Sequence, residues 1–307
     1  MVKVALVIPT IRKFTGWNTF KEAIKYSGFD VDVYTCGEEK DVNPHIDKVL
    51  YSSPKWREKQ FGKKNLWLFP PFTRHVNSIY AYIIKEKLNY DMIVTVDDDV
   101  ECEETFFIEH WKALNRYSQT KFENVLSCGY PRGFPYKYRK LDSSVMFNQG
   151  LWYNILDLNA HEYASPSNAI SKSGFNIAPK GKGITVSSMN VVFHRYLLPI
   201  YYQPVNWTRH DDIWAGLIVK IILDAYGDSM SYGYPFVRHN KFPRNIWEDN
   251  KKEANGHAIN EQMWDELQKI KLSGNMWNMY KQIANKLPFQ EITKYMKGWI
   301  KLVESFK

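Results

Sequence analysis

Hydrophobic residues in the first hundred positions form short runs that alternate with stretches of helical spacing. The run KVALVIP at 3–9 is apolar at successive positions, which is typical of a strand buried on both faces of a parallel sheet. Helical spacing follows at 17–26, an alternating strand at 31–35, helical spacing again at 75–88, and an apolar strand at 92–96. This alternation predicts βαβ units and a doubly wound sheet.

The pattern is less regular after residue 100. Strands are predicted at 125–129, 183–195 and 231–239, and a helix at 210–227. From about residue 245 the spacing becomes helical and carries several tryptophans, which we interpret as packing residues. We expect an α/β catalytic domain over residues 1–245, with a helical C-terminal extension over 246–307 packed on it.

The most informative polar feature is the triplet Asp97, Asp98 and Asp99, which directly follows the apolar strand at 92–96. Ligands of doubly wound sheets bind beyond the carboxyl ends of the strands. Three adjacent carboxylates repel one another, and one is expected to take up a proton unless a cation compensates. Mg²⁺ or Mn²⁺ would compensate, because hard ions prefer oxygen ligands. The alternative is a solvated acidic turn or the N-cap of a following helix.

A second acidic pair, Asp211 and Asp212, opens the helix predicted at 210–227. Helix capping explains such a pair without any further role. With Arg209 and His210, however, the pair forms a dense polar cluster suited to sugar hydroxyls or to acid and base chemistry.

Two arginines and one histidine are further candidates. Arg132 and Arg139 in RGFPYKYR carry planar guanidinium groups that suit phosphate, with surface solvation as the alternative. Because a guanidinium stays protonated and is a poor nucleophile, we assign both to a diphosphate clamp. His239, at the end of the predicted strand 231–239, is either structural or an extra metal ligand.

Composition narrows the class of partner. The chain has 41 basic and 33 acidic residues among 307, so its net charge of +8 favours an anionic partner: nucleic acid, a phosphate-bearing substrate or an acidic membrane surface. Its three cysteines lack CxxC spacing, which argues against a disulfide framework and a zinc site. Without a run of eighteen apolar residues or a secretory leader pattern, we expect a cytoplasmic location and no membrane contact.

Six segments, taken together and in order, resemble the reversibly glycosylated polypeptide family, whose plant members act as UDP-arabinopyranose mutases. They are VIPTIR (7–12), VTVDDDV (94–100), RGFPYKYR (132–139), QGLWYN (149–154), SSMNVVFHR (187–195) and RHDDIWAG (209–216). The resemblance implies a GT-A-like fold, a UDP-sugar ligand and a Mn²⁺ or Mg²⁺ ion at the aspartate triplet.

The resemblance also implies roles for individual residues. It places the catalytic residues at Asp211, Asp212, Arg132 and Arg139, with Arg132 on the family's self-glycosylated arginine. It places the contacts to the nucleotide sugar at Pro9, Thr10, Arg12, Asp97, Asp98, Trp152 and Asn190. It places the metal ligands at Asp97, Asp99 and His239. Asp157 keeps one acid of a D-x-D-A-P run that the family has in fuller form.

Three functions fit these observations. The first is transfer of arabinose from UDP-arabinose to an anionic acceptor, for which we name 5-hydroxymethylcytosine in bacteriophage DNA. The basic stretch 53–74, expected to be irregular surface, would then neutralise DNA phosphates, and its aromatic residues would stack on bases: Trp56, Trp67, Phe69 and Phe72. The second is UDP-arabinopyranose mutase activity without a macromolecular acceptor. The third is a binding module without catalysis.

Overall fold

The strands form one large sheet. The computed structural model describes residues 1–10, 14–38, 49–70, 75–118, 132, 135–136, 143–153, 155, 157–160, 174–204, 208–240 and 245–306. Its strands are β1 (Lys3–Pro9), β2 (Asp30–Cys36), β3 (Val49–Ser52), β4 (Met92–Val96), β5 (Val100–Cys102), β6 (Tyr117–Ser118), β7 (Ser143–Tyr153), β8 (Phe175–Ile177), β9 (Asn190–Phe193) and β10 (Ser229–His239). They are ordered β3-β2-β1-β4-β9-β7-β10-β5, with β6 paired to β7 and β8 to β10.

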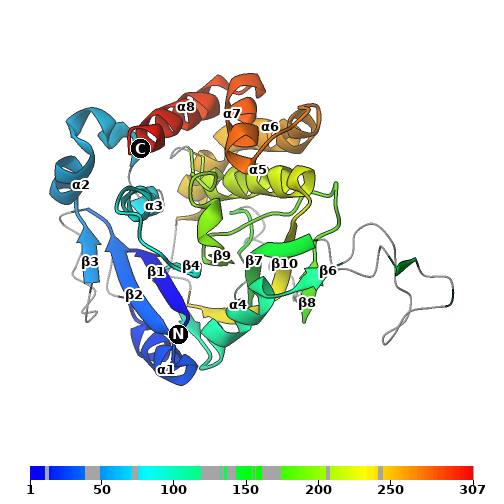
Figure 1. The fold of residues 1–307 in the computed structure, drawn as a ribbon. Coiled ribbons are helices and arrows are strands. Elements are labelled where there is room, and N and C mark those ends of the chain that lie inside the picture. Colours follow the sequence, from blue (N-terminus) through cyan, green and yellow to red (C-terminus); the bar gives the residue numbers. More distant parts are fainter. Residues whose placement is uncertain are drawn as a thin grey trace.

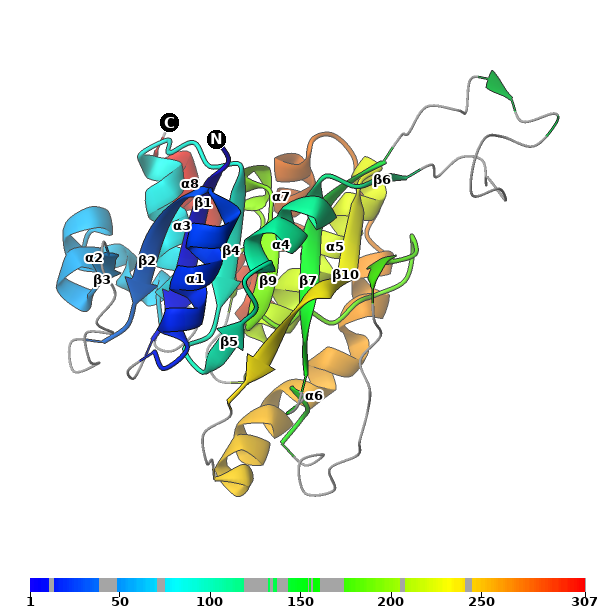
Figure 2. The same ribbon diagram turned by 90° about the horizontal axis from the view of Figure 1, so that it is seen from below.

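Helices cover both faces of this sheet. They are α1 (Trp17–Ser27), α2 (Pro54–Phe61), α3 (Val76–Lys85), α4 (Phe106–Leu114), α5 (Asp211–Tyr226), α6 (Ile246–Gln268), α7 (Met276–Lys286) and α8 (Gln290–Glu304), with 3₁₀ turns η1 (Lys63–Leu68) and η5 (Arg195–Leu197). Helices α1 and α4 lie on one face, whereas α3, α5, α7 and α8 lie on the other (Figures 1 and 2). None of the helices in the described part of the chain is long and apolar enough to cross a bilayer.

The direction of the strands confirms the predicted α/β class. Strands β1 to β4 are mutually parallel, β9 runs antiparallel between β4 and β7, and β10 pairs in parallel with β7. The result is a doubly wound, mostly parallel sheet followed by C-terminal helices. All the parallel strands therefore end at one edge of the sheet.

Strand β1 shows why a continuous apolar run belongs inside such a sheet. Ala5 and Val7 face a core shared with α3, α5 and the C-terminal helices. Val4, Leu6 and Ile8 face a second core beneath α1 and α4. All five are fully buried, so the prediction of a strand covered on both faces is confirmed.

Other predictions need correction. Strand β9 is shorter than the predicted strand 183–195, and the long strand β7 was not predicted, because its polar residues hid the pattern. The stretch 125–129 lies outside the described residues. Of the cysteines, Cys36 and Cys102 are free thiols, and burial raises the pKa of each to about 12, so both stay protonated.

Where it is described, the basic stretch 53–74 is helical and not irregular, whereas Lys55, Lys59, Lys63 and Lys64 are exposed, as expected of a basic surface. It forms α2 and η1, and Arg57 is 3% exposed because its Nη1 donates to the carbonyls of Gly37 and Ser52 at 3.0 and 2.6 Å. Phe69 is buried, and Trp56 packs edge-on against Phe61 and Tyr82.

Phe69 is therefore a core residue, and Trp56 is partly buried against the same core, so neither ring stands free to stack on a base. Trp67 is 40% exposed, yet it lies against Tyr295 of α8 with ring centroids 5.2 Å apart. Phe72 lies outside the described residues. Tertiary packing therefore covers much of the expected aromatic surface, and Trp67 is its exposed member among the described residues.

The C-terminal helices share a core with the sheet. Trp299 of α8 is fully buried, stacks on Tyr202 at a centroid distance of 4.8 Å and donates from Nε1 to the carbonyl of Pro199 at 2.8 Å. Residues of α6, α7 and α8 lie in the same cluster of buried side chains as residues of β1 and β4. This packing predicts that the helices and the sheet unfold together.

We expect Trp299→Ala to lower the free energy of unfolding by roughly 3–5 kcal/mol, because it leaves a large cavity. The measurement is urea denaturation followed by circular dichroism. Trp247→Ala is the matched control, since Trp247 is 81% exposed and its removal should leave the midpoint nearly unchanged. Two separate transitions, with only the first shifted by Trp299→Ala, would contradict a shared core.

Candidate functional site

The aspartate triplet occupies the turn between β4 and β5, at the carboxyl edge of the sheet. Thr10, at the end of neighbouring β1, donates from Oγ1 to Asp98 Oδ2 at 3.2 Å. The carbonyl of Asp99 accepts a hydrogen bond from the amide of Asn240 at 2.7 Å. Asp98 and Asp99 are buried, at 4% and 1% exposure, so the triplet is not a solvated acidic turn.

Strand pairing brings His239 to the triplet. Strands β10 and β5 are antiparallel with His239 opposite Val100, and His239 Nε2 lies 3.7 Å from Asp99 Oδ2. Its Nδ1 is 3.1 Å from the carbonyl of Ile155 and must be the donor there, because a carbonyl only accepts. That bond directs Nε2 toward Asp99, and histidines that bind metals are commonly oriented in this way.

Strand β9 brings two further acids. Its first residue lies opposite Val96, so the preceding serines pass close to the triplet. Ser187 Oγ donates to Asp157 Oδ2 at 2.8 Å. The amide and Oγ of Ser188 both donate to Asp212 Oδ2, at 2.8 and 3.1 Å. Asp212 therefore fixes the loop before β9, a role that helix capping alone does not explain.

Asp97 is at the centre of these acids. Its side chain is half-buried, but Oδ1 is fully buried and has no hydrogen-bond partner among the described residues. Burial raises the pKa of Asp97 well above its usual value, and the charges of Asp99, Asp98, Asp157 and Asp212 raise it further, in that order. Five carboxylates thus share one region at the end of β4.

These residues fit a hard divalent cation. Asp97 offers a buried oxygen without a partner, and Asp99 and His239 lie side by side. Within the described ranges no group of three or more acidic, histidine or cysteine side chains already forms a metal cage. A pair of protein ligands is nevertheless enough for Mg²⁺ or Mn²⁺ when water and substrate phosphates complete the shell.

Some of the other predicted contacts lie at the ends of strands or helices, and the rest are exposed or lie outside the described residues. Pro9 is buried at the end of β1, and Trp152 is half-buried near the end of β7. Asp211 is 2% exposed in the first turn of α5, next to Asp212. Pro9 and Asp211 lie at the end of the predicted strand and the start of the predicted helix, whereas Trp152 lies near the end of a strand that was not predicted. Arg132 is exposed, whereas Arg12 and Arg139 lie outside the described residues.

Asn190 occupies a different environment from the one expected of a ligand contact. It is fully buried, and its Nδ2 donates to the carbonyls of Leu151 and Pro235, both at 2.9 Å. Its Oδ1 accepts from Nε2 of His110 at 2.9 Å, and burial lowers the pKa of His110 to about 3, so that ring is neutral. Asn190 therefore joins β9 to β7, β10 and α4.

Ser187 and Ser188 were not predicted as site residues, and Asp157 was noted only for its place in the family pattern. Their importance arises from pairing between segments 24 and 30 residues apart, Ser188 with Asp212 and Ser187 with Asp157. Hydrophobic periodicity carries no signal for such pairs. The small polar run SSMN before an apolar strand was the available indication.

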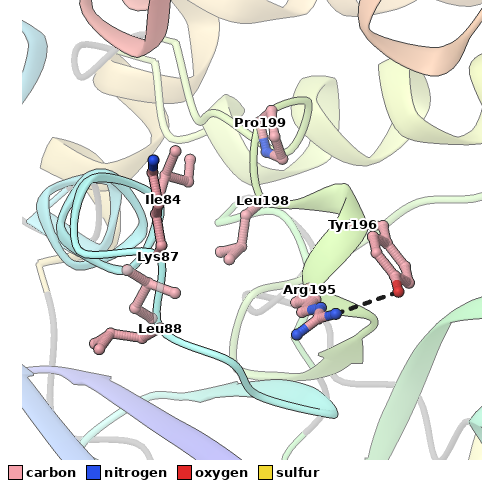
Figure 3. A pocket seen from close by; sticks show the side chains of 8 residues that line it. Ile84, Lys87, Leu88, Arg195, Tyr196, Leu198 and Pro199 are labelled. Carbon is pink, nitrogen blue, oxygen red and sulfur yellow. Dashed lines mark hydrogen bonds between the residues drawn. The ribbon is translucent and has the colours of Figure 1, made fainter. Parts of the chain in front are cut away.

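A hollow in the surface lies away from these acids. It measures about 300 Å³ and lies between α3 and η5, with Ile83, Leu88 and Leu198 in its walls and Lys87 and Arg195 beside them (Figure 3). Arg195 points its guanidinium at Tyr196, with Nη2 3.3 Å from the hydroxyl. None of its described lining residues carries a carboxylate, so its chemistry differs from that of the aspartate site.

Comparison with known proteins shows one matching protein family and several relatives. A family model described as "Reversibly glycosylated polypeptide" matches residues 18–307. UDP-arabinopyranose mutase 3 of Arabidopsis thaliana is 30% identical over 58% of this chain and 54% of its own length, and mutase 1 of the same plant is 28% identical over 63% and 59%. The chain thus spans little more than half the length of these relatives.

Among solved structures, one described as "Crystal Structure of a Mycobacterial Protein" is similar to this chain. It has a TM-score of 0.39 and 12% identity, over 79% of this chain and 68% of its own.

The raised pKa of Asp97 predicts how stability depends on pH without metal or ligand. Folding disfavours the ionised form, so the native state loses stability as the pH rises from the unfolded pKa of about 4 through the raised native pKa. Asp97→Asn removes this loss, so we expect a higher Tm than wild type at pH 8 and little difference at pH 3.5.

Calorimetric melting across that pH range is the measurement. Asp265→Asn, at an exposed position of α6, is the matched control for loss of one negative charge. A lower Tm for Asp97→Asn than for wild type at pH 8, with the control unchanged, would show that Asp97 is not under electrostatic strain.

Proposed function

Because the chain belongs to the reversibly glycosylated polypeptide family, we propose that it acts on a nucleotide sugar as a mutase, interconverting the pyranose and furanose forms of UDP-arabinose. The observation that carries this proposal is the group of five carboxylates around Asp97 at the edge of the sheet. The diphosphate of a UDP-sugar needs a cation beside it, and these acids attract one. The curated relatives are named as mutases of this kind.

Interconversion of the two ring forms breaks the bond between the anomeric carbon and the ring oxygen and forms one from that carbon to another hydroxyl oxygen of the sugar, while a proton moves from the attacking hydroxyl to the released oxygen. We propose that the bond between the sugar and the diphosphate breaks and re-forms during this exchange, so negative charge develops on the diphosphate. Asp97, Asp99 and His239 would hold Mn²⁺ or Mg²⁺, which when bound stabilises negative charge on the diphosphate. We assign Arg132 and Arg139 to the same diphosphate, as a bidentate clamp. Thr10 and Trp152 would line the nucleotide-sugar side of the site.

Proton transfer to or from the sugar would fall to Asp211 or Asp212. Asp212 accepts hydrogen bonds from Ser188 and from the amide of Ile213 at 2.9 Å, as an ionised carboxylate does. Those bonds hold Asp212 in one orientation near Asp97, where a sugar attached to the diphosphate would lie. A fixed carboxylate within reach of a sugar hydroxyl can act as a general base.

A second candidate function is transfer of arabinose to DNA, for which the specific observation is the net charge of +8. Its support in the described part of the chain is weaker than the sequence alone suggested. Arg57 of the basic stretch binds backbone carbonyls in the interior, and Phe69 packs in the core, with Trp56 partly buried against it. For this reason we place the mutase first.

We expect the purified protein, given UDP-arabinopyranose and Mn²⁺, to produce UDP-arabinofuranose without any acceptor. Chromatography of the sugar nucleotides measures this conversion, and mass spectrometry of added hydroxymethylcytosine DNA measures transfer in parallel. A gain of DNA mass without ring conversion would replace the mutase by the transferase. Absence of both reactions would reject UDP-arabinose as the substrate.

His239→Gln should weaken binding of Mn²⁺ in the presence of UDP by at least roughly tenfold, because it removes one proposed ligand. Titration calorimetry measures this affinity directly and does not depend on turnover. His194→Gln is the matched control, since His194 also bonds through Nδ1 to a backbone carbonyl, that of Asp91, at the other end of β4. Equal Mn²⁺ affinity in both variants would remove His239 from the site.

A further inference from the structure

Helix α6 reaches the candidate site through Arg209, the residue two positions before Asp211. Arg209 has a φ of +62°, in the left-handed region that residues other than glycine rarely adopt. Its Nη1 lies 2.9 Å from Asp249 Oδ1 and its Nε 3.1 Å from Glu253 Oε1, both on α6. Two ion pairs therefore hold Arg209, which lies just before the acidic pair Asp211 and Asp212.

Glu253 has a second contact on its other oxygen. Its Oε2 accepts a hydrogen bond from the amide of Ala160 at 2.8 Å, and the residue is 5% exposed. Ala160 follows Asp157 by three residues, and Arg209 precedes Asp212 by three. One buried carboxylate thus fixes two segments far apart in the sequence, each of which carries an acid of the site.

The same two segments meet again at the start of β9. Asp157 accepts from Ser187, and Asp212 accepts from the adjacent Ser188. The contacts therefore close a ring. Glu253 pairs with Arg209, from which the chain leads to Asp212, and Asp212 is bonded to Ser188. The neighbouring Ser187 is bonded to Asp157, from which the chain leads to Ala160 and so back to Glu253. The charges of Asp157 and Asp212 each raise the pKa of Asp97.

We infer that Glu253 is a positioning residue, whose two oxygens set the places of Asp157 and Asp212 relative to Asp97. A carboxylate suits this position, because Oε1 pairs with the charge of Arg209 while Oε2 accepts from the amide of Ala160. Glutamine has nearly the same shape but would turn an N–H group toward one donor and break one side of the ring. The consequence for catalysis rests on the proposed function, whereas the link between the segments does not.

Close packing keeps α6 from shifting to compensate. A Cβ added at Gly256, one turn after Glu253, would lie 2.4 Å from His210 Nδ1 and 2.8 Å from the Cβ of Thr208. The helix therefore already packs against the side chains of Thr208 and His210, which lie just before α5. In Figure 2, α6 crosses beyond the ends of β7 and β10, the edge where the acids gather.

Hydrogen exchange of the whole protein, measured by mass spectrometry, tests the ring without any substrate. In Glu253→Gln we expect faster exchange in peptides that contain the amides of Ala160 and Ser188, although Ser188 does not touch Glu253. Glu266→Gln is the control on the same helix, because its carboxylate bonds to exposed Lys269, and it should alter neither peptide. Faster exchange at Ala160 with no change at Ser188 would overturn the inference.

A second variant separates the side chain of Arg209 from its backbone strain. Arg209→Gly accepts the positive φ and removes both ion pairs, so it should reproduce the change at Ser188 even if Glu253→Gln folds poorly. The double variant should change no more than either single one, since both remove the same link. Additive changes would show that Arg209 and Glu253 act separately and would contradict the ring.

Turnover tests the catalytic consequence. Because small displacements of a reacting group cost up to about 100-fold, we expect Glu253→Gln to lower kcat roughly 10- to 100-fold with KM nearly unchanged. Glu253→Asp, which keeps two acceptor oxygens, should recover part of the loss. Unchanged kcat alongside faster exchange at Ser188 would refute a positioning role. A wild-type protein without mutase activity would refute the proposed function and leave the exchange result standing.

Discussion

Repulsion between carboxylates at the end of β4 is the constraint on which the site depends. Asp97 is surrounded by four other acids, and the contacts described for three of them come from groups without charge: the hydroxyl of Thr10 and the amide and hydroxyls of Ser187 and Ser188. The charges of these acids raise the pKa of Asp97 in the folded protein, and a bound cation would relieve that repulsion.

Strand order is what concentrates these acids. Strands β1 and β4 are parallel neighbours, so Thr10 and the aspartate triplet emerge at the same edge. Antiparallel β9 starts where β4 ends, and the pairing of β10 with β5 brings in His239. The C-terminal helices complete the arrangement, because α6 anchors both segments that carry the outlying acids.

The sequence pattern predicted those elements whose structure depends on residues that are neighbours in the sequence. Strand β1 and the aspartate triplet were found because apolar residues are continuous and acids adjoin them. Strand β7 was missed because Asn148 and Gln149 look solvent-exposed in sequence, whereas both are buried; Asn148, for example, accepts from Ser231, 83 residues away. Arg57 was misplaced for the same reason, since two backbone carbonyls accept from it in the interior and Glu38 pairs with its charge at 3.5 Å. Partners distant in sequence decide such cases, and a single sequence does not reveal them.

The most direct test of this account is a crystal grown with UDP and Mn²⁺ and measured at the manganese absorption edge. The account predicts an anomalous peak in contact with Asp99 and His239, beside Asp97 and the diphosphate. Bound UDP with no peak among these three side chains, or a peak that contacts none of them, would contradict the claim that the crowded carboxylates exist to hold a cation.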